Sequence, residues 1–178
     1  YLGEWDEQYI HDGMVRGDTM YAGCINTGEL YVVDVSNKNN PTTIGTHPTP
    51  NAFTHNAWVS DDGNFVFTTD EKSDAYLAAY DITDINNIQE VERIQSNPGS
   101  GTIPHNVHVD GNFLITSYYR DGTTVHDISH PNNMIQVAYY DSYAGSGDGF
   151  DGCWGTYPFF PSGIIISSEI NSGSNQSA

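Results

Sequence analysis

One stretch of the sequence decides the fold: THNAWVSDDGNFVFTTDE, residues 54–71. It predicts a strand, a tight turn at Asp62-Gly63 and a second strand, because β-branched and aromatic residues flank a dipeptide typical of hairpins. The same pattern occurs earlier as IHDGMVRGDTMYAG, residues 10–23, and later as PHNVHVDGNFLITS, residues 104–117. The chain therefore repeats one hairpin unit, and each copy opens with a histidine.

Each hairpin is followed by two further strand patterns. The third strand of each unit ends in aspartate and is followed by a turn rich in Asn, Asp or Pro; these strands are residues 29–36, 76–83 and 123–129. The fourth strands are residues 42–47, 88–94 and 134–140. Four short antiparallel strands per ~45 residues are typical of β-propeller blades, which bury their faces by stacking on one another. A β-sandwich and a stacked β-solenoid are the alternatives.

We therefore predict an all-β chain with about three complete four-stranded blades and part of another. The expected divisions are the end of a preceding blade at 1–8, blades at 9–50, 51–100 and 101–148, and a partial blade with a Ser/Asn-rich tail at 149–178. Closed rings usually hold about four to eight blades. We thus expect a segment of a larger propeller, completed by other segments or by other copies.

The partial copy can be aligned with residues 54–71. FDGCWG, residues 150–155, matches THNAWV, so Asp151 takes the place of the histidine and Trp154 that of Trp58. Residues 163–169 match residues 64–70, which puts Glu169 where Asp70 stands.

The composition excludes some functions. There are 23 acidic residues against 5 basic ones, a net charge of -18, so nucleic-acid binding lacks the cations it needs and anionic membranes repel the surface. No apolar run reaches the ~18 residues needed to span a bilayer. The acidic charge, the start at Tyr1 and the lack of a signal peptide favour a mature or trimmed piece of a secreted protein.

The two cysteines, Cys24 and Cys153, lack the paired spacing of a zinc site. Two buried unpaired thiols are the first interpretation, and a disulfide is the alternative.

A family resemblance rests on the third strands and on the blade openings. LYVVDVS, residues 30–36, resembles LVIVD repeats, while the His-Asn or His-Asp openings and Thr69-Asp70-Glu71 resemble the secreted bacterial proteins called choice-of-anchor B. The resemblance covers most of residues 9–171. It implies a β-propeller exported to, or displayed at, the cell surface, and it implies no established enzymatic activity.

The three repeated histidines are the first candidate site. In a propeller the first strand of each blade lines the central channel, so equivalent positions converge. His11, His55 and His105, with Asp151 from the partial copy, have the side-chain types of a transition-metal site. The alternative is that each ring binds neighbouring backbone and has a structural role.

Other polar residues recur where strands end. Asp70, Glu71 and Glu169 close second strands, and carboxylates at a channel mouth suit Ca²⁺ or Mg²⁺; solvated surface groups are the alternative. Tyr118 and Arg120 are expected to shape a pocket rim. The aspartates that end the third strands are expected to bond the N–H groups of the following turns; they are Asp34, Asp81 and Asp127.

No catalytic motif of the hydrolase, phosphate-loop or dinucleotide-binding type is present. The sequence therefore favours an extracellular or cell-surface binding or scaffold module that contacts protein or glycan, rather than an enzyme. The alternative is a metal-binding propeller or metalloenzyme that uses the histidines.

Overall fold

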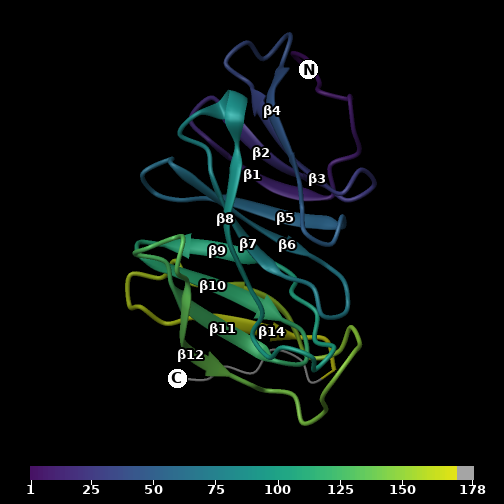
Figure 1. Cartoon of the computed structure of the whole chain (residues 1–178), viewed down its shortest axis with the longest axis vertical. Helices are drawn as coiled ribbons and strands as arrows, with labels where there is room; N and C mark the ends of the chain where they lie inside the picture. The colour runs from purple at the N-terminus through teal and green to yellow at the C-terminus, as the bar shows by residue number, and fades with distance from the viewer. Residues whose placement is uncertain (172–178) are drawn as a thin grey trace.

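The computed structural model describes residues 1–171, and nearly all its regular structure is β-strand (Figure 1). The first blade contains β1 (Asp12–Arg16), β2 (Thr19–Cys24), β3 (Glu29–Asp34) and β4 (Thr42–Pro48), paired in that order. The second contains β5 (Thr54–Val59), β6 (Phe65–Asp70), β7 (Leu77–Asp81) and β8 (Gln89–Ile94). The third contains β9 (Val107–Asp110), β10 (Phe113–Tyr118), β11 (Gly122–Asp127) and β12 (Ile135–Tyr140).

A partial blade follows, in which β13 (Cys153–Tyr157) pairs with β14 (Ile166–Glu169) in a two-stranded sheet. The one short helix of this range is the 3₁₀ turn Ile85–Asn87. No helix in residues 1–171 is long and apolar enough to cross a membrane. The all-β prediction and the four antiparallel strands of each blade are thus confirmed.

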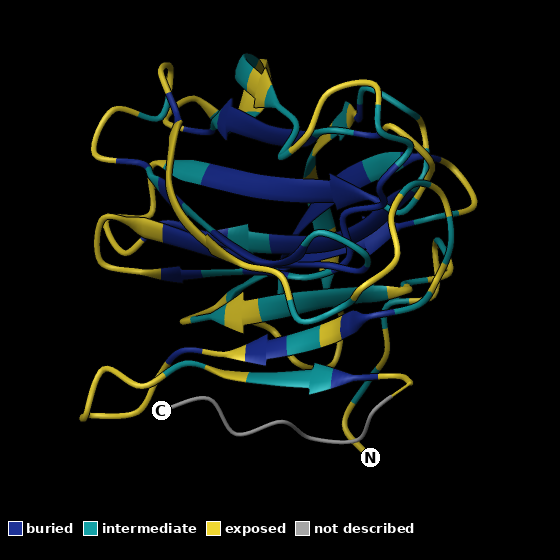
Figure 2. Cartoon of the chain, turned by 90° about the horizontal axis from the view of Figure 1, so that it is seen from below, coloured by how far each residue is buried: buried dark blue, intermediate teal, exposed yellow. Residues whose placement is uncertain are grey.

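The blades stack through alternating residues of their middle strands. Val66 in β6 and Tyr80 in β7 pack against the first blade, in a core with Leu30. The neighbouring residues Phe67 and Ala79 pack against the third blade. Because successive strand residues point to opposite faces, one middle strand supplies apolar side chains to the cores on both sides of its blade. Figure 2 shows the result: the middle strands are buried, and exposed residues gather in loops and outer strands.

The first strands bring the blades together at their inner edges. β5 contacts both β1 and β2, β9 contacts β5 and β6, and β13 contacts β10 and β11. Residues at the start of these strands therefore come close together, although they lie far apart in the sequence.

Local turn chemistry follows the repeat. Gly63 and Gly111 in the hairpin turns have φ of 76° and 58°, a region that glycine enters without the steric penalty of a side chain. The Asp34 carboxylate accepts from the Ser36 N–H at 2.8 Å, and the equivalent bonds are Thr83 N–H to Asp81 at 2.9 Å and Ser129 N–H to Asp127 at 2.8 Å. The predicted structural role of these aspartates is confirmed.

The chain before β1 contains no strand. The Trp5 indole donates to Thr43 Oγ1 in β4 at 3.0 Å, and its ring meets that of Tyr31 with the ring centres 5.5 Å apart. The segment thus contacts the first blade through Trp5, and its assignment to the end of a preceding blade stays a prediction.

Both cysteines are buried and free, as expected for unpaired thiols. Burial raises the pKa of the Cys24 and Cys153 thiols to about 11, so neither is a reactive thiolate at neutral pH.

A buried histidine makes the stability depend on pH. Burial lowers the pKa of His126 to about 4, although the Gln136 side chain across the strand pair favours the protonated ring. The unfolded chain, with an ordinary pKa of about 6.5, therefore binds a proton before the folded chain does. Stability from the neutral ring is complete above about pH 6.5 and is lost as the pH falls toward 4.

We expect this group to contribute a loss of about 2 kcal/mol in unfolding free energy between pH 7 and pH 5. Between pH 7 and pH 5 the unfolding free energy of His126→Leu should therefore fall by about 2 kcal/mol less than that of the wild type. Urea unfolding at both pH values measures this difference. His130→Leu, which changes an exposed histidine in the same blade, is the control for the substitution itself. Equal pH dependence of the wild type and His126→Leu would contradict the assignment.

Candidate functional site

Three histidines lie in a row at the inner edge of the blades. His11 lies directly before β1, His55 lies in β5, and His105 lies two residues before β9. The ring centres of His11 and His55 are 4.3 Å apart, as are those of His55 and His105. His55 and His105 are only 3% and 4% exposed, whereas His11 is exposed. The structure thus brings the three predicted rings together.

Strand register shows which residue of the partial blade continues the row. In the second blade Thr54 lies opposite Asp70 and Asn56 opposite Thr69, so a bulge leaves His55 without a partner. In the partial blade Cys153 lies opposite Glu169 and Gly155 opposite Ser168, which leaves Trp154 without a partner in the same way.

Trp154, rather than Asp151, is therefore the structural counterpart of His55. Its ring centre lies 5.4 Å from that of His105. The sequence alignment, which matched the two tryptophans, is shifted by three residues in the first strand of this blade. In the second strand it is correct, because Glu169 lies opposite Cys153 as Asp70 lies opposite Thr54.

Asp151 and Arg120 pair with each other instead of facing the histidines. Asp151 forms an ion pair with Arg120 through Oδ2 and accepts from Asn171 Nδ2 at 3.1 Å through Oδ1. The hydrogen bond from Arg120 lowers the pKa of Asp151. Neither residue lines the histidine cavity described below.

Adjacent tyrosines at the end of β10 face opposite ways. Tyr118, expected at a pocket rim, is only 1% exposed and packs in the core between the second and third blades. Tyr119 lines the histidine cavity. Tyr118 is the last residue of β10, whereas Tyr119 lies beyond the strand with a φ of 25°, so the backbone changes direction between them.

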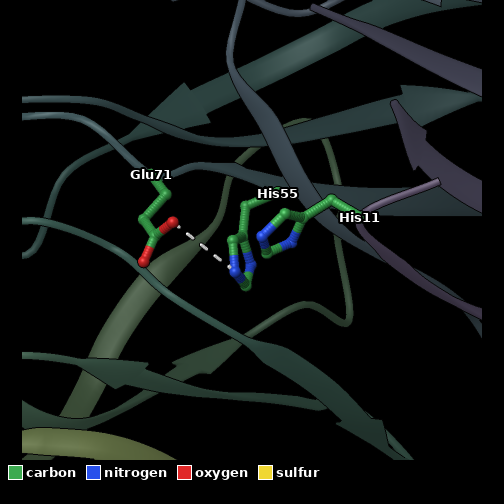
Figure 3. Close-up of side chains that lie close together, drawn as sticks. All are labelled: His11, His55 and Glu71. Carbon is green, nitrogen blue, oxygen red and sulfur yellow. Dashed lines mark ion pairs between the residues drawn. The ribbon is translucent and has the colours of Figure 1, made fainter. Parts of the chain in front are cut away.

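Glu71 places a carboxylate between two of the rings. Its Oε2 lies 3.6 Å from His55 Nε2 (Figure 3), and its Oε1 lies 3.7 Å from His105 Nε2. The Tyr119 hydroxyl donates to Oε1 at 2.6 Å. Burial raises the pKa of Glu71, and the Tyr119 hydrogen bond opposes this rise.

Burial keeps the inner histidines neutral. It lowers the pKa of His55 to about 3, with a further contribution from neighbouring His105, and that of His105 to about 4. The Nδ1 atoms of both rings are buried and make no hydrogen bond with the described residues. A neutral imidazole with a free lone pair is the form that binds metals.

Three side chains have donor atoms close enough to share an ion. The donor atoms of His11, His55 and Glu71 all lie within 4.8 Å of one another. Tetrahedral zinc with bonds of ~2.0–2.1 Å needs donors about 3.3 Å apart. The donor atoms must therefore move closer together to share such an ion. The exposed His11 ring can supply much of this movement (Figure 3).

The cluster opens onto a cavity of about 440 Å³. A second polar layer holds the wall of this cavity: Asp12 Oδ2 accepts from Asn56 Nδ2 at 3.0 Å and from Asn106 Nδ2 at 3.1 Å. Each of these residues directly follows one of the histidines. The lining residues are His11, Asp12, His55, Glu71, His105, Asn106, Tyr119 and Trp154.

Asp70 and Glu169 lie away from this cavity and hold loops. Asp70 is fully buried and accepts from Thr49 Oγ1 at 2.5 Å, Asn51 N–H at 2.7 Å and Phe53 N–H at 3.1 Å. Glu169 accepts from the Ser142 hydroxyl. Of the three carboxylates predicted at a channel mouth, only Glu71 lines the site.

Comparison with known proteins supports the fold. The family described as LVIVD repeat matches residues 14–49. The periplasmic gluconolactonase PpgL of Pseudomonas aeruginosa is similar at a TM-score of 0.73 and 14% identity, covering 92% of this chain and 48% of that one. The Cps50 (Swd1) β-propeller domain of Myceliophteria thermophila is similar at a TM-score of 0.65 and 12% identity, and the match covers 93% of this chain and 49% of that one. The fold is that of β-propeller blades.

Chain length differs among these structures. The chain spans about half the length of PpgL and Cps50. The computationally designed Ika4 protein is similar at a TM-score of 0.69 and 13% identity, and the match covers 97% of this chain and 92% of Ika4. No curated protein matches the sequence significantly.

Asp70→Ala should lower the unfolding free energy by about 3 kcal/mol, because the three donors of residues 49–53 lose their buried acceptor. The exposed Asp110, changed to Ala, should stay within about 0.5 kcal/mol of the wild type. Urea unfolding at pH 7 measures both. A destabilisation no larger than that of Asp110→Ala would show that Asp70 does not hold this loop.

Proposed function

We propose that this chain is a binding module of a secreted or cell-surface propeller protein and that it binds a divalent transition-metal ion through His11, His55 and Glu71. The observation that carries the proposal is the convergence of these three donors within 4.8 Å. Their residues come from two blades and are 60 positions apart at the extremes, from 11 to 71.

The donor set favours a transition metal over calcium. Two imidazoles and one carboxylate suit Zn²⁺, Cu²⁺ or Ni²⁺, whereas Ca²⁺ takes about 6–8 oxygen ligands. The other lining carboxylate, Asp12, accepts hydrogen bonds through both oxygens. Asp70 and Glu169 accept hydrogen bonds from loop residues. We therefore place the proposed ion at the histidines.

Glu71 is oriented for this role by its neighbours. Because Tyr119 donates to Oε1, Oε2 is left facing His55. A hydrogen-bonded partner of this kind fixes a carboxylate ligand and tunes the metal. The His105 ring lies beside Oε1, the carboxylate oxygen that accepts from Tyr119.

Export of the protein is part of the same proposal. It is supported by the net charge of -18, by the LVIVD repeat at residues 14–49 and by the periplasmic location of PpgL. Contacts with surface proteins or glycans, and completion of the ring by other segments or copies, would follow from the exposed loops and from the span of about half a propeller.

Titration of metal-free protein with Zn²⁺ should give one bound ion by calorimetry and elemental analysis. His55→Ala and Glu71→Gln should each weaken binding by more than roughly 100-fold, since each removes a ligand rather than a supporting residue. His130→Ala, which changes an exposed histidine outside the cluster, is the matched control. Absence of Zn²⁺ binding, or equal affinity in all variants, would refute the proposed function.

Tyr119→Phe tests the orientation of Glu71. It removes the hydroxyl that donates a hydrogen bond to Glu71 Oε1 and keeps the ring, so Zn²⁺ affinity should fall by ~10–100-fold. Unfolding midpoints measured on the same samples separate this effect from a loss of structure. An unchanged Zn²⁺ affinity would mean that the hydrogen bond does not position the ligand.

A further inference from the structure

Exposed aromatic rings line the histidine cavity or contact residues that line it. Trp154 lines the cavity, yet it is 55% exposed. Tyr9, 60% exposed, meets His11 edge-on with the ring centres 6.3 Å apart. Phe150, 57% exposed, meets Tyr119 with the ring centres 5.3 Å apart. Three exposed rings thus contact three different lining residues.

Exposed aromatic rings beside a polar cavity are typical of ligand sites. An aromatic face offers a flat apolar platform at low entropic cost. Below the rim the cavity presents polar groups: the Asn106 amide, the Tyr119 hydroxyl and the Asp12 carboxylate. His55 and His105, more than nine-tenths buried with unpartnered Nδ1 atoms, lie in the same wall.

The charges of the cavity select the class of ligand. Its lining holds two carboxylates, Asp12 and Glu71, and no Lys or Arg among the described lining residues. A bound divalent cation would balance these two charges. An anionic ligand would then meet a neutral site within a strongly acidic protein, whereas a neutral ligand would meet no repulsion.

The three proposed donors leave a coordination position of the ion free on the cavity side. Zinc sites with three protein ligands bind a further oxygen donor, such as water or a substrate group. The ligand that fits is therefore neutral, carries hydroxyl groups for the ion and the polar wall, and has an apolar face for Trp154. Sugar rings combine these properties.

We propose that the cavity binds a neutral sugar unit, stacked on Trp154 with a hydroxyl directed to the metal. This inference rests on the proposed metal binding and adds the ligand class to it. Trp154 is a binding residue here, and it occupies the blade position that holds histidine in the three complete blades.

The experiment uses the Zn²⁺-loaded chain and three neutral oligosaccharides, cellohexaose, maltohexaose and chitohexaose. At least one should change the tryptophan emission and give a saturable isotherm by calorimetry. Anionic hexagalacturonate should not bind. Trp154→Ala should weaken sugar binding by at least about 10-fold, the loss expected for one aromatic contact, while Zn²⁺ affinity stays unchanged.

The matched control is Tyr139→Ala, which removes a 70% exposed aromatic side chain from β12 and should change neither affinity. Metal-free protein should bind the sugar at least about 10-fold more weakly, since one contact is lost. Failure of all three neutral sugars, equal binding by Trp154→Ala, or an effect of Trp154→Ala on oligomeric state alone would overturn the inference. Because Zn²⁺ binding is measured on the same samples, its failure would be recognised separately as failure of the proposed function.

Discussion

The carboxylate of Asp12 joins the three complete blades at their inner edges. Its Oδ2 accepts amide hydrogen bonds from Asn56 and Asn106, one from each of the next two blades. Asn56 in turn accepts from the Val107 N–H at 3.1 Å. Hydrogen bonds to a charged acceptor contribute about 1.5–3 kcal/mol each, and these cross blade boundaries. They hold the first strands of the three blades at the same position along the channel. The histidine that precedes each of Asp12, Asn56 and Asn106 therefore lies at that position too.

This constraint explains how much of the site the sequence could predict. Because one repeat unit builds every complete blade, the strand order, the hairpin glycines and the convergence of His11, His55 and His105 followed from recurrence alone. Residues outside the recurrence did not follow. Glu71 and Asp70 are neighbours, and only the strand geometry shows that one faces the rings while the other is buried under residues 49–53.

Two sequence assignments differ from the structure, one in the partial blade and one in the third blade. A bulge adds one unpaired residue to a strand, and sequence similarity carries no sign of where this residue lies. Aligning Trp154 with Trp58 therefore put Asp151 at the histidine position, while the bulge assigns that position to Trp154. In the third blade no bulge is involved: nothing in the sequence distinguishes Tyr118 from Tyr119 until one is seen in the core and the other in the cavity.

The cluster also works against the stability of the chain that contains it. Two imidazoles are buried with Nδ1 atoms that find no partner among residues 1–171, and an unsatisfied buried polar group costs about 1–3 kcal/mol. Leucine at these positions would avoid that cost and suit the apolar strands beside them. Local rules that fail at a few residues while holding elsewhere mark functional sites. Since His11, His55 and Glu71 all come from the first two blades, the cluster is formed within this chain.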